Sequence, residues 1–177
     1  MEGKKGYIHI YCGDGKGKTT AALGLAVRAA GRGKKVLIAR FLKTDDSGEV
    51  MALSQISGIT VLPCKKTFGF YFQMTESQKR EAEEYYGDQL KKAWSQASEE
   101  GYDMLILDEI MAACTCRLVS EGKLVQYLEE KPKELEVVMT GRNPPEQLIH
   151  MAEYVSEIHK RKHPFDVGIG AREGIEY

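Results

Sequence analysis

The chain has 177 residues, a formal net charge of −1 and a hydrophobic share of 42%. This length suits one globular domain, and the hydrophobic share argues against a disordered protein. A charge near zero disfavours a dedicated nucleic-acid-binding protein, because such domains are usually basic. No apolar stretch approaches the roughly 20 residues that cross a bilayer, and residues 1–6 show no signal-peptide core. We therefore expect a single-domain cytoplasmic protein over residues 1–177 that binds neither nucleic acid nor membrane.

Cysteine usage agrees with a reducing compartment. The four cysteines are Cys12, Cys64, Cys114 and Cys116. None forms a C-x-x-C pair, so we expect free thiols. The alternative is a zinc site, whose ligands would be Cys114, Cys116, His159 and His163. The spacing of structural zinc ligands is missing, which disfavours that alternative.

The first part of the chain alternates apolar runs with segments of helical period. We expect a strand over 7–11, a glycine-rich loop, a helix over 18–30, strands over 36–41 and 59–62, and a polar loop over 43–48. The run over 36–41 is almost continuously apolar, which indicates a strand buried on both faces.

The second part continues the same alternation. Thr75 and Gln78 have the spacing of a capping box at the start of a helix over 75–100. We further expect strands over 104–107, 136–139 and 154–158, a helix over 111–130, either continuous or interrupted, and a short helix before the last strand. Strands that alternate with helices predict a single-domain α/β fold of the P-loop NTPase type, with a mostly parallel sheet and helices on both faces.

A glycine-rich loop joins the first expected strand to the first expected helix. Its residues are Gly13, Asp14, Gly15, Lys16, Gly17, Lys18 and Thr19, followed by Thr20. Backbone N–H groups and the helix start favour phosphate there, Lys18 can reach phosphate oxygens, and the Thr19 hydroxyl can join a Mg²⁺ shell. The alternative is a glycine-rich turn without a ligand. Cys12 stands where the general G-x-x-x-x-G-K-[ST] pattern has glycine, so this loop is one residue shorter.

Polar residues follow two buried strands at the edge of the sheet where the loop is expected. Asp108 and Glu109 come after the run over 104–107, and Arg142 follows the run over 136–139. We predict that the two carboxylates hold Mg²⁺, against the alternative of an acidic pair that favours a helix start. Arg142 is a candidate contact for phosphate or for a substrate carboxylate, the alternative being a surface arginine.

The segment 68–72 carries four aromatic residues, three of them phenylalanines. Core packing or a strand is the simpler interpretation. The functional alternative is a platform for a flat hydrophobic ligand.

Taken together, these features resemble the ATP:corrinoid adenosyltransferase family over nearly the whole chain. The resemblance is carried by the short loop, Lys43, Gly48, Glu49, the aromatic segment, the Asp108–Glu109 pair, Thr140 to Arg142, Lys162 to Asp166 and Gly174 to Tyr177. It implies transfer of the 5′-deoxyadenosyl group of ATP to Co(I) of a corrinoid, with release of triphosphate.

The resemblance also assigns roles. Lys18 and Glu109 would be catalytic, and Thr19, Asp108 and Glu109 would hold Mg²⁺ or Mn²⁺. Residues 13–20 with Arg142 would bind ATP, in an orientation reversed from that in ordinary hydrolases. Phe70 and Phe72 would lie beside the corrin ring and disfavour a lower axial ligand on cobalt. A reduced flavoprotein as electron donor and a homodimer are the implied partners.

Two other functions remain open at this point. One is an ordinary P-loop ATPase or small-molecule kinase, which the shortened loop and the aromatic segment disfavour. The other is a delivery protein in which ATP binding gates the transfer of a corrinoid to a partner.

Overall fold

The computed structural model describes residues 5–176, so the expectations for residues 1–4 and for Tyr177 lie outside it. Six parallel strands form one sheet in the order β3-β2-β4-β5-β1-β6. The strands are β1 Ile8–Cys12, β2 Val36–Arg40, β3 Ile59–Val61, β4 Met104–Asp108, β5 Glu136–Thr140 and β6 Tyr154–Glu157. The predicted parallel α/β fold is confirmed.

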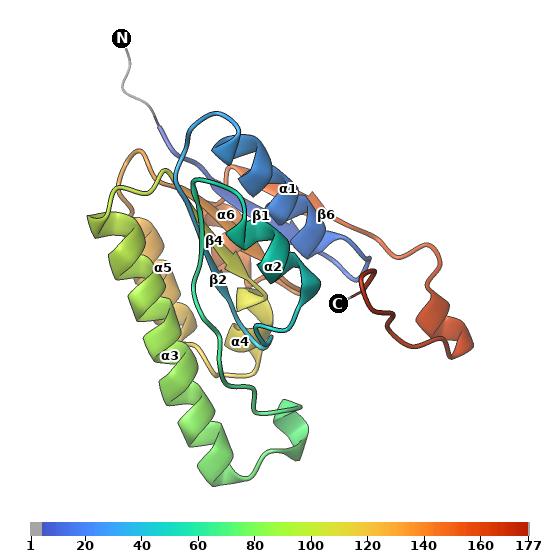
Figure 1. Cartoon of the computed structure of the whole chain (residues 1–177). Coiled ribbons are helices and arrows are strands. Elements are labelled where there is room, and N and C mark those ends of the chain that lie inside the picture. The colour runs from blue at the N-terminus through green and yellow to red at the C-terminus, as the bar shows by residue number, and fades with distance from the viewer. Residues whose placement is uncertain (1–4, 177) are drawn as a thin grey trace.

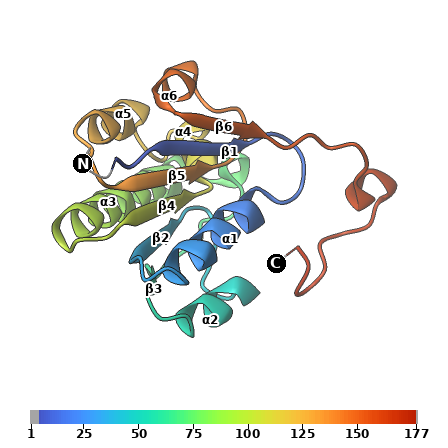
Figure 2. The ribbon, with the colours of Figure 1, turned by 90° about the horizontal axis from the view of Figure 1, so that it is seen from above.

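Helices cover both faces of this sheet (Figures 1 and 2). They are α1 Lys18–Ala30, α2 Gly48–Ser54, α3 Glu76–Glu99, α4 Ile110–Thr115, α5 Glu121–Glu129 and α6 Glu146–Met151, with 3₁₀ turns η1 Tyr71–Gln73 and η2 Pro164–Val167. Viewed along the layers, α1 and α2 lie on one face, and α3, α5 and α6 lie on the other (Figure 2). None of the helices within residues 5–176 is long and apolar enough to cross a membrane.

The strand β2 shows why the central strands are apolar throughout. Leu37 and Ala39 belong to the hydrophobic core under α3 to α6, whereas Val36 and Ile38 belong to the core under α1 and α2. Because successive side chains point to opposite faces, a strand covered on both sides needs apolar residues at every position.

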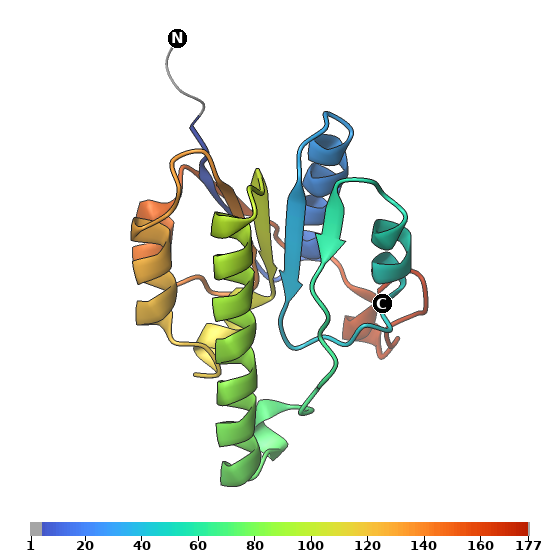
Figure 3. The same cartoon turned by 60° about the vertical axis from the view of Figure 1, so that its left-hand side comes forward.

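The helix α3 begins with the predicted capping box. Thr75 Oγ1 accepts a hydrogen bond from the Gln78 N–H, and the Gln78 side chain accepts one from the Thr75 N–H. Figure 3 shows α3 running along the whole sheet to the η1 turn at its lower end. The capping box therefore fixes where α3 begins, just after η1 and the aromatic segment that η1 partly contains.

Three details differ from the sequence-based expectations or sharpen them. The helix α2 was not predicted, and it follows directly on the polar loop. The stretch 111–130 forms two helices, α4 and α5, which is the interrupted form of the prediction. The helix α1 ends at Ala30 as predicted, and Gly33, with φ 76°, is the left-handed glycine that follows it.

Candidate functional site

The candidate site lies at the edge of the sheet where the parallel strands end. The glycine-rich loop leaves β1 and enters α1, and the ends of β2, β4 and β5 lie beside it because their strands pair in register. Open parallel sheets bind ligands at this edge. The topology thus brings residues from positions 13, 43, 108 and 140 into one region.

The glycine-rich loop is fixed by tight backbone geometry. Gly13 has a φ of 103°, and a Cβ there would lie 2.4 Å from the Ile158 carbonyl oxygen. The Gly15 N–H donates to that same carbonyl at 2.7 Å, and the Lys160 N–H donates to Asp14 Oδ1 at 2.9 Å. The segment after β6 therefore fixes the loop through the hydrogen bonds of Ile158 and Lys160.

The loop turns into α1 at Gly17, which has a φ of 115°. Such a left-handed conformation strongly favours glycine. The following residue, Lys18, is buried, and its Nζ donates to the Gly15 carbonyl oxygen at 2.8 Å. The Lys18 ammonium is consequently held over the loop, where phosphate oxygens are expected.

A second group of polar atoms surrounds the buried Asp108 carboxylate. Its Oδ1 accepts from the Thr19 hydroxyl at 2.8 Å and from the Thr140 hydroxyl at 2.7 Å. Its Oδ2 pairs with Lys43 Nζ at 2.6 Å, and the same ammonium lies 2.9 Å from Thr19 Oγ1. Sequence reasoning had assigned roles to Thr19 and Asp108 but none to Lys43 or Thr140.

Glu109 lies beside this group at the start of α4. Its backbone is left-handed, with φ 61°, which costs a non-glycine residue about 1–2 kcal/mol. Its N–H donates to Thr140 Oγ1 at 2.9 Å, which helps to hold this conformation. Strained backbone of this kind is frequent at functional sites.

The electrostatics of the site show closely packed charges. Burial, followed by the nearby Asp108, raises the pKa of Glu109, while Lys43, Lys18 and Arg142 oppose that rise. Burial also lowers the pKa of Lys18, and the Glu109 carboxylate partly offsets this effect. In both groups the charged form is less favourable in the protein than it would be in water. Such perturbed pKa values are typical of residues at functional sites.

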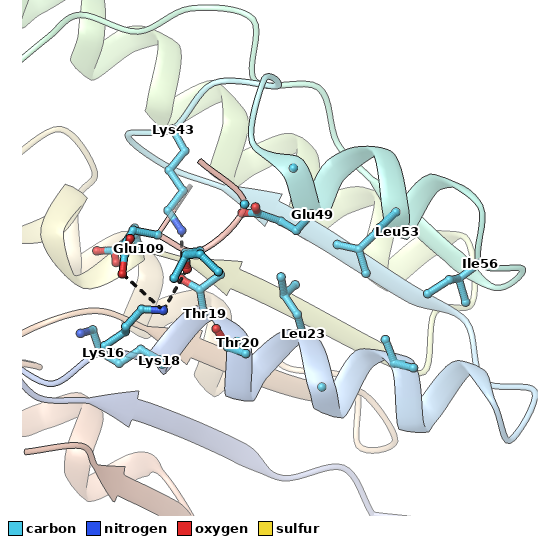
Figure 4. A pocket seen from close by; sticks show the side chains of 18 residues that line it. Lys16, Lys18, Thr19, Thr20, Leu23, Lys43, Glu49, Leu53, Ile56 and Glu109 are labelled. Carbon is cyan, nitrogen blue, oxygen red and sulfur yellow. Dashed lines mark hydrogen bonds and ion pairs between the residues drawn. The ribbon is translucent and has the colours of Figure 1, made fainter. Parts of the chain in front are cut away.

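A cavity of about 680 Å³ opens beside the loop, within the size range of small-molecule sites. Figure 4 shows Lys16, Lys18, Lys43 and Glu109 gathered at one end of it. The other end, between α1 and α2, is apolar and carries Leu23, Leu53 and Ile56 (Figure 4). The cavity therefore has lysine and glutamate side chains at one end and hydrocarbon at the other.

The C-terminal tail closes part of this cavity. Lys16 Nζ donates to the Ile175 carbonyl oxygen at 2.9 Å and lies 4.0 Å from Glu176 Oε1. Gly174 also lines the cavity. The tail had contributed to the family resemblance without an assigned role.

Arg142 lines a second cavity of about 600 Å³, which also borders the loop. Asp14 of the loop, Lys160 and His163 line it as well. Arg142 is exposed, and its charge nevertheless affects the pKa values of Lys18 and Glu109. Its assignment to ATP stays a prediction.

The aromatic segment does not join these cavities. Phe70 and Phe72 are 67% and 78% exposed, and their rings stack with centroids 5.5 Å apart. Neither ring lines the two cavities that residues 5–176 form beside the loop. Phe68, in contrast, packs against Tyr85 and Tyr86 of α3. The segment is therefore partly core and partly an exposed aromatic pair.

The oxygen atoms around Asp108 suit a hard divalent cation. The Thr19 hydroxyl and the Asp108 carboxylate are already in contact, and Glu109 lines the same cavity. Magnesium usually takes one or two carboxylates and completes its shell with water and phosphate oxygens. Within residues 5–176 there is no group of three or more acidic, histidine or cysteine side chains that could hold a metal ion.

Comparison with known proteins identifies the family. A family model described as ATP:corrinoid adenosyltransferase BtuR/CobO/CobP matches residues 4–177. This chain belongs to the ATP:corrinoid adenosyltransferase family. The corrinoid adenosyltransferase of Escherichia coli K12 is 34% identical over 175 residues, covering 98% of this chain and 87% of that protein. The corrinoid adenosyltransferase CobA of Salmonella typhimurium is 32% identical over 179 residues, with the same coverage.

Solved structures agree on the fold. The ATP synthase subunit NeqB of Nanoarchaeum equitans matches with a TM-score of 0.55 and 13% identity, covering 87% of this chain and 47% of that chain. A KaiC-like protein of Pyrococcus horikoshii matches with a TM-score of 0.52 and 15% identity, covering 90% of this chain and 75% of that chain. The adenosyltransferase family member described here thus has a P-loop-like α/β fold.

Proposed function

We propose that this chain transfers the 5′-deoxyadenosyl group of ATP to the Co(I) centre of a corrinoid substrate and releases triphosphate. The electron pair on cobalt forms a bond to C5′ of ATP, and the bond between C5′ and the α-phosphate oxygen breaks. The observation that carries this proposal is the contact of Thr19, Lys43 and Asp108 beside the shortened loop, in a chain that matches the family over nearly its whole length.

The leaving group is a polyanion, so the main task of the protein is to stabilise developing negative charge. Lys16, Lys18 and Lys43 supply ammonium groups at one end of the larger cavity. Backbone N–H groups of the loop and the start of α1 add further positive potential. No side-chain nucleophile or general base is needed, because the attacking electrons belong to the substrate cobalt.

In this proposal Thr19, Asp108 and Glu109 hold Mg²⁺ or Mn²⁺. When bound, that ion neutralises charge on the phosphate oxygens. Burial and then the neighbouring Asp108 raise the pKa of Glu109, and a cation beside the two carboxylates would stabilise their charged forms. The fit of these oxygen ligands to a hard cation supports the assignment.

The remaining parts of the proposal rest on the family resemblance. Phe70 and Phe72 would contact the corrin ring, and their exposure leaves both rings accessible to a large flat substrate. A reduced flavoprotein would supply electrons, the protein would act as a homodimer, and the reaction would take place in the cytoplasm.

One assay tests the proposed reaction. Purified protein is mixed with Mg²⁺, ATP and chemically reduced cob(I)alamin, and corrinoid absorbance and phosphate products are followed together. We expect a light-sensitive alkyl-corrinoid and an equal amount of triphosphate. ADP and phosphate with an unchanged corrinoid spectrum would instead indicate an ATPase or kinase. Tight binding of both ligands without turnover would indicate a delivery protein.

A further inference from the structure

A buried arginine, Arg40, contacts the segment after β2 that contains Lys43. Arg40 is the last residue of β2 and is 1% exposed. Its Nη1 donates to the Thr44 carbonyl oxygen at 2.7 Å, and its Nη2 pairs with Asp45 Oδ1. One guanidinium thus holds two successive residues of the segment that follows β2.

The Asp45 carboxylate also binds the chain just after a second strand, β3. It accepts the Cys64 N–H at 2.9 Å on Oδ1 and at 3.1 Å on Oδ2. Cys64 lies just after β3, which is the neighbour of β2 at the edge of the sheet. The segment from 41 to 45 is therefore tied to the ends of two strands.

The same segment makes a sharp turn that needs such ties. The Phe41 N–H donates to the Asp108 carbonyl oxygen at 2.9 Å, and Leu42 then adopts a left-handed conformation with φ 59°. A branched side chain disfavours this conformation. The turn directs Lys43 back toward Thr19 and Asp108. The position of the Lys43 ammonium therefore depends on the interactions that hold this turn.

Stability alone explains this arrangement poorly. Burying a guanidinium removes its hydration, and a buried ion pair is often no more stabilising than apolar residues of the same volume. The Asp45 side chain is 36% exposed, and Arg40 Nε has no hydrogen-bond partner within residues 5–176. The planar fork of arginine is, in contrast, well suited to fixing the position of two acceptors at once.

We propose that Arg40, acting through Thr44 and Asp45, is a positioning residue that holds the Lys43 ammonium at the phosphate end of the cavity. The proposal deepens the proposed function, because Lys43 matters there as a cation for the triphosphate.

Binding of ATP with Mg²⁺, measured by calorimetry without corrinoid, tests this role in the full chain. The variants are Arg40→Met, Lys43→Met and the double variant. Gln89→Met is the matched control, since Gln89 is also buried and its side chain donates to the nearby Pro63 carbonyl oxygen at 3.2 Å rather than to the segment 41–45. We expect Arg40→Met and Lys43→Met each to weaken binding by about tenfold, which corresponds to about 1.4 kcal/mol.

The decisive result is the coupling between the two sites. If Arg40 acts only by placing Lys43, the double variant binds ATP no more weakly than Lys43→Met. The proposal would be overturned if the losses of ATP affinity in the two single variants multiplied in the double variant. It would also be overturned if Arg40→Met bound ATP as tightly as the wild type or as Gln89→Met. Arg40→Lys keeps the charge but not the fork, so we expect it to restore binding only partly.

Two further measurements keep the test decisive. Should Arg40→Met fail to fold by circular dichroism, Asp45→Asn replaces it, because this partly exposed carboxylate is the link to Cys64; unchanged ATP affinity in Asp45→Asn would then overturn the proposal. Adenosyl transfer is measured in parallel. A wild-type protein that binds ATP but forms no adenosylcorrinoid contradicts the proposed function, whereas the binding data still decide the role of Arg40.

Discussion

Replacing Thr140 by valine tests how much the polar group around Asp108 contributes to stability. Thr140 is fully buried, and its hydroxyl donates to Asp108 Oδ1 at 2.7 Å while accepting the Glu109 N–H at 2.9 Å. Valine has nearly the same shape and removes both hydrogen bonds. A bond to a charged group contributes about 1.5–3 kcal/mol, and a buried donor left unpaired costs about 1–3 kcal/mol. Since Glu109 lines the cavity, we take the lower part of the second range and expect a total loss of about 3 kcal/mol.

The assay is urea or thermal unfolding followed by the fluorescence of Trp94, the single tryptophan, which stacks on Tyr127. In a chain of this size, a loss of about 3 kcal/mol lowers the Tm by about 6–12 °C. Thr140→Ser is the control, because it keeps the hydroxyl and removes one methyl group, at a cost of about 1 kcal/mol. A Thr140→Val protein that is no less stable than Thr140→Ser would refute the reasoning.

Three further predictions concern the site itself. Lys18→Ala should lower the rate of adenosyl transfer about 100-fold or more, because it removes a cation aimed at the leaving group; a near-normal rate would exclude that role. Glu109→Gln should raise the Tm at pH 7 more than at pH 4. Folding raises the pKa of Glu109, so ionisation of this carboxyl destabilises the folded wild-type protein as the pH rises from 4.5 through the higher pKa of the folded state. Glutamine does not ionise and avoids this loss. An equal gain in Tm at both pH values would contradict this reasoning. Phe72→Ala should slow the reaction that starts from Co(II) more than the reaction that starts from pre-reduced Co(I), and equal losses in the two assays would show that Phe72 only packs against its neighbours.

Local signals were sufficient for the framework of the site. The glycine pattern placed the glycine-rich loop between β1 and α1, and the buried run before Asp108 placed that carboxylate at the carboxyl edge of the sheet. Both inferences depend on short stretches of sequence whose periodicity and residue types have direct structural meaning. The capping box of α3 was predictable for the same reason.

The contacts within the site depend on tertiary structure and were not predictable in this way. Lys43 reaches Thr19 and Asp108 only because Leu42 turns the chain, and nothing in the polar composition of that segment indicates a left-handed leucine. Arg40 ends an apolar run, where its burial follows from acceptors that lie four and five residues further along. The exposure of Phe70 likewise depends on how the loop before α3 packs.

The position of β1 has a consequence for how the protein is made. This first strand pairs only with β5 and β6, with Ile8 opposite Val137 and His9 opposite Tyr154. At ordinary synthesis rates the ribosome needs roughly 10 s to go from β1 to the end of β5. During that time β1 has neither of its neighbouring strands, and the glycine-rich loop that follows it lacks their support. The proposed nucleotide site can therefore reach its final form only after β5 and β6 have been synthesised.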